Sequence, residues 1–284
     1  MRYRRLGERG QEFPVACTDR GLVDLRPLTA DVDGAFLSGT SPQVVHDAIE
    51  RGDLGVVPDS EALRVGAPIA RPGKVVCIGL NYRDHAAETG ASTPDEPVVF
   101  LKDPATVVGP YDTVYIPRGS TKTDWEIELG VVIGAEARYL QDVEHAADCV
   151  AGFVVSHDVS ERAFQLERGG QWDKGKSCET FNPVGPDLVT VDEVEDVQRL
   201  DLALDVNGVR RQQGSTADMV FGVHHLVWYL SQFMVLHPGD LINTGTPAGV
   251  ALGRPDAPYL RPGDVVDLAI SGLGAARQRF EAAP

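Results

Sequence analysis

The chain has 284 residues, of which 43% are hydrophobic and 24% charged, a composition typical of a globular protein. Its net charge of −16 disfavours nucleic acid and anionic membranes as partners, because both attract positive charge. No apolar run approaches the ~20 residues that span a bilayer. The basic N-terminus has no apolar stretch behind it, so we expect a cytoplasmic protein rather than a secreted one.

The first 70 residues differ from the rest, and we expect them to form a small N-terminal α+β module. Residues 13–25 contain two short strand-like pieces, and residues 41–51 have the pattern of a helix. A turn-rich connection then leads to a strand over residues 74–79. We therefore place a boundary near residue 71, which makes residues 71–284 the main domain.

Short strands separated by Gly, Pro and Asn/Asp turns dominate this main domain. An Asn-Gly pair at residues 207–208 predicts a hairpin. Regular βα alternation is missing, so neither a dinucleotide-binding fold nor a βα barrel is expected. We predict a mixed α/β, mainly β fold with peripheral helices over residues 85–89, 140–148, 161–167 and 222–234.

Glu126 and Glu128 stand one residue apart in a strand-like segment, residues 124–134. Side chains at i and i+2 of a strand share a face, so the two carboxylates should lie side by side. The apolar neighbours favour a buried strand, although an exposed edge strand would also explain two glutamates. A second apolar segment, residues 151–158, ends in Asp158. Because clustered like charges need a cation or a shared proton, we predict a divalent-cation site.

Ligation by carboxylates alone selects a hard cation. Mg²⁺ is the first choice and Mn²⁺ the second, with Ca²⁺ as a further candidate. Zinc would recruit His or Cys, and the four cysteines lack CxxC spacing. His157 should point to the opposite face of the strand from Asp158, so it is left out of the ligand set. The other role open to Asp158 is to cap the helix that follows it, which is compatible with metal binding.

His85 and Glu88 come shortly after the strand that ends at Gly79. If His85 opens a short helix, Glu88 lies one turn further on the same face. A carboxylate in that position orients the imidazole as a general base towards water. The alternative is a solvated surface pair, which is the usual role of a helical His-x-x-Glu.

Two further segments supply candidate substrate contacts. Lys176 lies in a Gly-Lys-Ser triplet, but the spacing and context of a nucleotide-binding phosphate loop are missing. We expect Lys176 to bind a substrate carboxylate or to stabilise an oxyanion. Gly245 and Thr246 lie in a Gly/Thr loop, residues 243–250, that offers hydroxyl and backbone N–H donors; a simple turn is the alternative.

Together these segments resemble the fumarylacetoacetate hydrolase superfamily, from about residue 71 to the C-terminus. The motifs that carry the resemblance keep their order along the chain: residues 79–82 with His85 and Glu88, then 125–129, 157–162, 175–177 and 244–250. The resemblance implies a β-sandwich or roll catalytic domain and a homodimer. It also implies Mg²⁺ or Mn²⁺ held by Glu126, Glu128 and Asp158.

The same resemblance implies roles for individual side chains. His85 and Glu88 would act as a dyad on a segment that becomes ordered as a lid over bound substrate. Lys176, Gln165 and Thr246 match positions that contact substrate in relatives.

One position departs from the family pattern. Eukaryotic fumarylacetoacetases carry a further metal-ligating aspartate seven residues before the catalytic histidine, where this chain has Ile78. The site therefore resembles that of the three-carboxylate acylpyruvases. Residues 168–177 are most similar to bacterial hydrolases of 2,4-diketo-3-deoxy sugar acids.

The expected activity is hydrolysis of the C3–C4 bond of a 2,4-dioxo acid, which gives pyruvate and a carboxylic acid. The expected partner is thus a small anionic 2-oxo acid. Three other reactions fit the same site: decarboxylation of oxaloacetate, isomerisation of 2-hydroxyhepta-2,4-diene-1,7-dioate, and a ureidoglycolate lyase activity. A metabolite-binding module is the alternative outside enzymes, but a binder needs no His85–Glu88 base.

Overall fold

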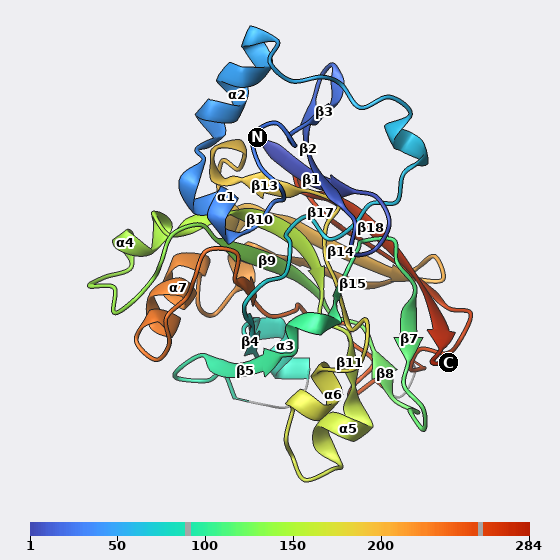
Figure 1. Ribbon diagram of the computed structural model, residues 1–284. Coiled ribbons are helices and arrows are strands. Elements are labelled where there is room, and N and C mark those ends of the chain that lie inside the picture. The colour runs from blue at the N-terminus through green and yellow to red at the C-terminus, as the bar shows by residue number, and fades with distance from the viewer. Residues whose placement is uncertain (89–91, 255–257) are drawn as a thin grey trace.

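The computed structural model describes residues 1–88, 92–254 and 258–284. A nine-stranded mixed sheet forms its centre, and strands from distant parts of the chain lie side by side in it (Figure 1). The strand order is β3 (Gly21–Asp24), β2 (Phe13–Thr18), β1 (Arg2–Leu6), β13 (Leu188–Thr190), β10 (Val150–His157), β9 (Ile127–Ile133), β16 (Leu241–Asn243), β4 (Val75–Gly79) and β5 (Val98–Lys102).

A five-stranded sheet covers one face of this central sheet. Its order is β15 (Val209–Ser215), β14 (Asp201–Val206), β17 (Val265–Ile270), β18 (Gly274–Ala282) and β7 (Val114–Ile116). Two short ladders join β8 (Thr123–Asp124) to β11 (Ser160–Glu161) and β6 (Val107–Val108) to β12 (Asn182–Pro183). The expected mainly β fold is therefore confirmed.

The helices lie around the sheets, as Figure 1 shows. They are α1 (Gly34–Gly39), α2 (Pro42–Arg51), α3 (Arg83–Glu88), α4 (Glu144–Ala147), α5 (Arg162–Leu166), α6 (Asp173–Lys176) and α7 (Val223–Ser231). No helix in the described ranges is long and apolar enough to cross a membrane.

The two faces of the central sheet bury separate hydrophobic cores. The larger core lies between the two sheets and takes Ile127, Leu129 and Val131 from β9, which is buried along its whole length. The smaller core lies under the N-terminal strands and helices and takes Val132 of the same strand. A strand buried on both faces carries few polar side chains, so Glu128 on β9 needs a specific partner.

We expect Leu129→Ala to lower the free energy of unfolding by about 2–5 kcal/mol, because it opens a cavity in the larger core. Urea denaturation followed by fluorescence measures this change. Val209→Ala is the control, since Val209 is 52% exposed. A loss from Leu129→Ala no larger than that of the control would contradict the assignment of Leu129 to the core.

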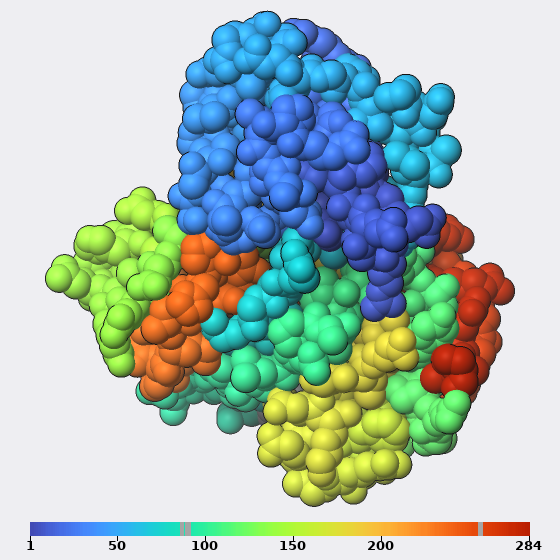
Figure 2. Space-filling model, in the orientation of Figure 1, coloured from blue at the N-terminus to red at the C-terminus, as the bar shows by residue number. Residues whose placement is uncertain are grey.

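The N-terminal segment extends the central sheet. Strand β1 pairs antiparallel with β13, and α2 buries Val45, Ala48 and Ile49 against the smaller core. In the space-filling view this blue segment forms the upper part of the molecule (Figure 2). That residues 1–70 form a module of their own stays a prediction.

The local expectations differ in their outcome, and the hairpin is confirmed. The hairpin turns at Asn207 and Gly208, both at positive φ, between β14 and β15. The helix expected over residues 140–148 is shorter, because the Asp142 carboxylate accepts a hydrogen bond from the His145 N–H and the helix begins only at Glu144. The last residue of the helix expected over 85–89, Thr89, lies outside the described residues.

A closed ring of side-chain hydrogen bonds joins the strands β10, β12 and β16. The Asn182 amide donates to Ser156 Oγ (2.9 Å), and Ser156 Oγ donates to Asn243 Oδ1 (2.8 Å). The Asn243 amide then donates to Asn182 Oδ1 (2.9 Å). All three side chains are buried, so the ring fixes β10, β12 and β16 relative to one another.

Candidate active site

The structure brings Glu126, Glu128 and Asp158 together. Glu128 lies on β9 with Glu126 two residues before it, and Asp158 follows β10 directly. The two strands pair antiparallel, with Ser156 opposite Glu128, and the Asp158 N–H donates to the Glu126 carbonyl (3.0 Å). Oxygens of the three carboxylates lie within 4.8 Å of one another, and all three residues are buried.

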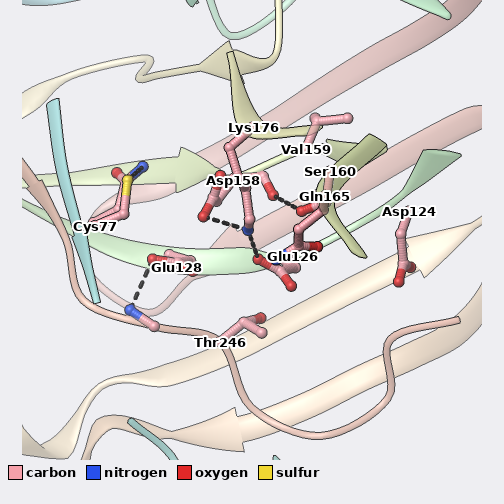
Figure 3. A network of polar contacts seen from close by, with 12 residues as sticks. Cys77, Asp124, Glu126, Glu128, Asp158, Val159, Ser160, Gln165, Lys176 and Thr246 are labelled. Atoms are coloured by element: carbon pink, nitrogen blue, oxygen red, sulfur yellow. Dashed lines mark hydrogen bonds and ion pairs between the residues drawn. The ribbon is translucent and has the colours of Figure 1, made fainter. Parts of the chain in front are cut away.

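This cluster is electrostatically uneven (Figure 3). Burial, together with the charges of Asp158 and Glu126, raises the pKa of Glu128 well above its usual value. The Gly245 N–H donates to Glu128 Oε2 (2.8 Å). Burial also opposes ionisation of Glu126, but the nearby Arg162 and Lys176 outweigh it and lower its pKa. Glu128 is therefore the least compensated of the three carboxylates.

Three buried cations surround the carboxylates. Lys176 Nζ lies 2.5 Å from Glu126 Oε2 and 2.7 Å from Asp158 Oδ2. Figure 3 shows both contacts as dashed lines. Lys102 Nζ lies 2.5 Å from the other Asp158 oxygen. Arg162 bridges Glu126 Oε1 (2.5 Å) and Asp124 Oδ2 (2.8 Å).

Charge counting tests whether a divalent cation fits this cluster. Four carboxylates (Asp124, Glu126, Glu128 and Asp158) face three cations, which leaves one negative charge if all are ionised. The raised pKa of Glu128 reflects this excess. An oxygen-only donor set with uncompensated negative charge is what a hard cation requires, so the residues fit one.

His85 and Glu88 lie on α3, one helical turn apart as expected. His85 Nδ1 is 3.7 Å from Glu88 Oε2, and the same carboxylate oxygen accepts a hydrogen bond from the Gly249 N–H (2.9 Å). Burial opposes ionisation of Glu88, but these two partners outweigh it and lower its pKa. Glu88 is therefore an ionised carboxylate held next to the imidazole. The lid prediction falls partly on residues 89–91, outside the described chain.

A cavity of about 220 Å³ joins His85 to the carboxylates. Seven of the predicted site residues line it: His85, Glu126, Glu128, Asp158, Gln165, Lys176 and Thr246. Gly245 and Glu88 are not among the residues that line the cavity, but each contacts one that does. Gly245 contacts Glu128, and Glu88 contacts His85. Ile78, at the position of the additional family aspartate, lines the cavity with an apolar side chain.

The predicted substrate contacts already have partners within the protein. Gln165 Oε1 accepts from Arg162 Nη1 (3.1 Å). The Thr246 hydroxyl donates to the Ile127 carbonyl and accepts from the Gln212 amide, both at 2.7 Å. As expected, His157 points away from the cluster, and its Nδ1 pairs with Gln278 (2.9 Å).

The sequence interpretation missed Lys102, Arg162 and Asp124. Arg162 had a usable signal, because it follows Asp158 by four residues at the start of α5. Lys102 had none, since it reaches Asp158 from the edge strand β5, 56 residues earlier in the chain.

Fold and site together define a mainly β protein with a buried carboxylate cluster that could hold a cation. A family model described as fumarylacetoacetate (FAA) hydrolase C-terminal matches residues 74–281. A proposed hydrolase of Burkholderia orbicola is 50% identical over 281 residues, which is 98% of each chain. The chain belongs to the fumarylacetoacetate hydrolase family, whose members are enzymes.

Two solved structures extend the comparison. A proposed HpcE protein from Mycobacterium smegmatis is 37% identical with a TM-score of 0.86, and 100% of each chain is covered. A proposed 2-hydroxyhepta-2,4-diene-1,7-dioate isomerase from Mycobacterium abscessus is 33% identical with a TM-score of 0.82, again over 100% of each chain. The chain is thus similar both to proteins named as hydrolases and to proteins named as isomerases.

Proposed function

We propose that the chain is a metal-dependent hydrolase that cleaves the C3–C4 bond of a 2,4-dioxo acid. The observation that carries this proposal is the His85–Glu88 pair beside the carboxylate cluster, with His85 and the three carboxylates lining one cavity. A carboxylate-oriented imidazole removes a proton from water, which hydrolysis needs. Glu126, Glu128 and Asp158 would hold Mg²⁺ or Mn²⁺, and the bound cation would supply Lewis-acid stabilisation of negative charge on the substrate.

The chain's own residues account for the proton movements. Glu88 orients the imidazole through Nδ1, and the other ring nitrogen takes a proton from water as the water oxygen bonds to C4 of the substrate. Lys176 and Arg162 place positive charge near the oxyanion that develops on C4. The C3–C4 bond then breaks, its electron pair stays with C3, and the imidazolium returns the proton there. The products are pyruvate and a carboxylic acid.

Isomerisation is the second candidate, because several similar solved structures carry isomerase names and the same dyad can move a proton between carbons. Incubation of the protein and Mg²⁺ with 2,4-dioxopentanoate, oxaloacetate and 2-hydroxyhepta-2,4-diene-1,7-dioate separates the reactions. We expect pyruvate from the first substrate, at a rate well above that for oxaloacetate. Isomerisation of the diene without pyruvate release from the dioxo acid would refute the proposal.

Binding of a cation at the carboxylate cluster should raise the thermal stability of the protein. A cation that binds only the folded protein stabilises it by about 2.7 kcal/mol at one hundred times its Kd. We expect thermal unfolding in excess Mg²⁺ to occur at a higher temperature than in EDTA. Equal concentrations of K⁺ serve as the ionic-strength control. The same midpoint with Mg²⁺ and with EDTA would contradict the metal assignment.

The homodimer implied by the family resemblance is also a proposal. Sedimentation velocity measures it directly: a mass near twice the 30.6 kDa of one chain supports the dimer, and a mass near 30.6 kDa refutes it.

A further inference from the structure

The residues that line the cavity beside the carboxylates fall into two chemically distinct groups, which we call the floor and the wall. Its floor carries the polar side chains that the proposed reaction uses. Its wall, among the described residues, is entirely apolar or backbone and consists of Ile78, Gly79, Leu80, Phe100, Leu166, Trp172 and Leu252. A substrate whose 2-oxo acid head lies on the floor would therefore place its tail against this wall.

Trp172 is the largest side chain of the wall, and its position is fixed on two sides. Its ring packs edge-to-face on Phe100, with centroids 5.4 Å apart. It also lies directly over Gly79, where an added Cβ would come within 2.8 Å of Trp172 Cζ3. Since Gly79 has no side chain, the indole can lie against the end of β4 and close one side of the cavity.

The wall residues carry no charge of their own, but the charge of Lys176 lies near them, with its Nζ 5.0 Å from the centroid of the Phe100 ring. Among the described lining residues, the lysine and arginine are Lys176 and Arg162; both pair with carboxylates of the cluster, and the proposed reaction uses their charge at the oxyanion on C4 rather than at the tail. A second carboxylate on the substrate would leave water without gaining a cation, which is costly. The overall charge of −16 opposes it further.

From this division we propose that the site selects 2,4-dioxo acids with a short apolar tail, and that Trp172 is a residue that determines this specificity. The inference rests on the proposed function. It favours an alkyl acylpyruvate over both a dicarboxylate and a polyhydroxylated sugar acid. The cavity volume of about 220 Å³ suits a short tail, because sites for drug-sized ligands are larger, roughly 300–1,000 Å³.

The test compares three substrates that share a head and a chain length: 2,4-dioxoheptanoate, 2,4-dioxoheptanedioate and 5,6-dihydroxy-2,4-dioxoheptanoate. Their hydrolysis gives pyruvate together with butanoate, succinate and dihydroxybutanoate, respectively. We expect kcat/KM for 2,4-dioxoheptanoate to exceed that for the dicarboxylate by on the order of 10²-fold. The dihydroxy compound should also be slower, by on the order of 10-fold.

Trp172→Ala should reduce the preference for the alkyl tail over the dicarboxylate by on the order of 10-fold, and Trp172→Phe should restore most of it. Phe233→Ala is the matched control, because Phe233 is a 66% exposed aromatic residue outside the cavity. Its substrate preference should equal that of the unmodified enzyme. If the Ala variant folds poorly, two measurements keep the test valid. One is the substrate preference of the Phe variant. The other is the ratio of the binding constants of N-propyloxamate and N-(2-carboxyethyl)oxamate, which carry an alkyl tail and a carboxylate tail on the same head.

The outcomes separate the two proposals. If no 2,4-dioxo acid releases pyruvate, the proposed function fails. If the dicarboxylate or the dihydroxy compound is cleaved as fast as 2,4-dioxoheptanoate, the proposed function stands and the tail inference is overturned. The tail inference is also overturned if both Trp172 variants keep the preference for the alkyl tail over the dicarboxylate unchanged.

Discussion

The His85→Ala variant is expected to lose about 10²–10⁴-fold in kcat for pyruvate release from 2,4-dioxopentanoate. The cause is the loss of the group that takes a proton from water, because His85 lines the cavity beside the carboxylates. Mg²⁺ affinity should change little, since His85 is not one of the clustered carboxylate ligands. Coupled detection of pyruvate and titration calorimetry with Mg²⁺ measure the two quantities separately.

A matched variant distinguishes the base from its partner. Glu88→Gln keeps a side chain of the same shape near Nδ1 but removes the charge, so its loss in kcat should be smaller than that of His85→Ala. If His85→Ala retains more than half of the activity, the dyad has no part in the mechanism. If it loses Mg²⁺ affinity as well, His85 belongs to the cation site instead.

Glu128→Gln should abolish both Mg²⁺ binding and turnover while the protein stays folded. Changes to groups that only support metal ligands cost 10–100-fold, so loss of a ligand should cost at least about 10²-fold in affinity. The amide oxygen can still accept the hydrogen bond from Gly245. Because burial and two neighbouring carboxylates raise the pKa of Glu128, a neutral side chain there relieves repulsion.

Glu126→Ala is the contrasting variant. It should also lose cation and activity, but it leaves Lys176 and Arg162 without a shared partner. Breaking a buried ion pair in this way costs roughly 3–5 kcal/mol of stability. Urea denaturation in EDTA should therefore give a higher free energy of unfolding for Glu128→Gln than for Glu126→Ala. A fully active Glu128→Gln enzyme that still responds to Mg²⁺ would remove Glu128 from the ligand set.

Strand periodicity in the sequence predicted that Glu126 and Glu128 lie side by side, and the structure brings them together, although Glu126 lies just before β9 and not on the strand. The helical spacing of His85 and Glu88 was equally readable. What brings these groups together is the pairing of β9 with β10 and the position of α3, which no local pattern contains. The mainly β class followed from the turn-separated short strands.

The missed residues share a physical cause. Lys102 and Arg162 act through partners 56 and 36 residues away, so their roles depend on tertiary packing. Trp172 lies in the segment of residues 168–177 that carries part of the family resemblance, but only the folded structure shows that it lines the cavity and contacts Phe100 and Gly79. The helix expected over residues 140–148 was too long, since α4 spans only Glu144–Ala147, and the hydrogen bond from the His145 N–H to the Asp142 carboxylate before the helix was not anticipated.

The hydrogen-bonded ring of Ser156, Asn182 and Asn243 has a consequence for how the enzyme can diversify. A slip of β10 by one residue would exchange the faces of Asp158 and His157, so an imidazole would replace a carboxylate in the cluster. The ring penalises that slip without touching substrate. The tail wall is built on other segments, around Leu80, Trp172 and Leu252, which lie outside the ring. Proteins that evolve from this fold can therefore change the residues of the tail wall, and with them the substrate, while the ring keeps Asp158 in the carboxylate cluster.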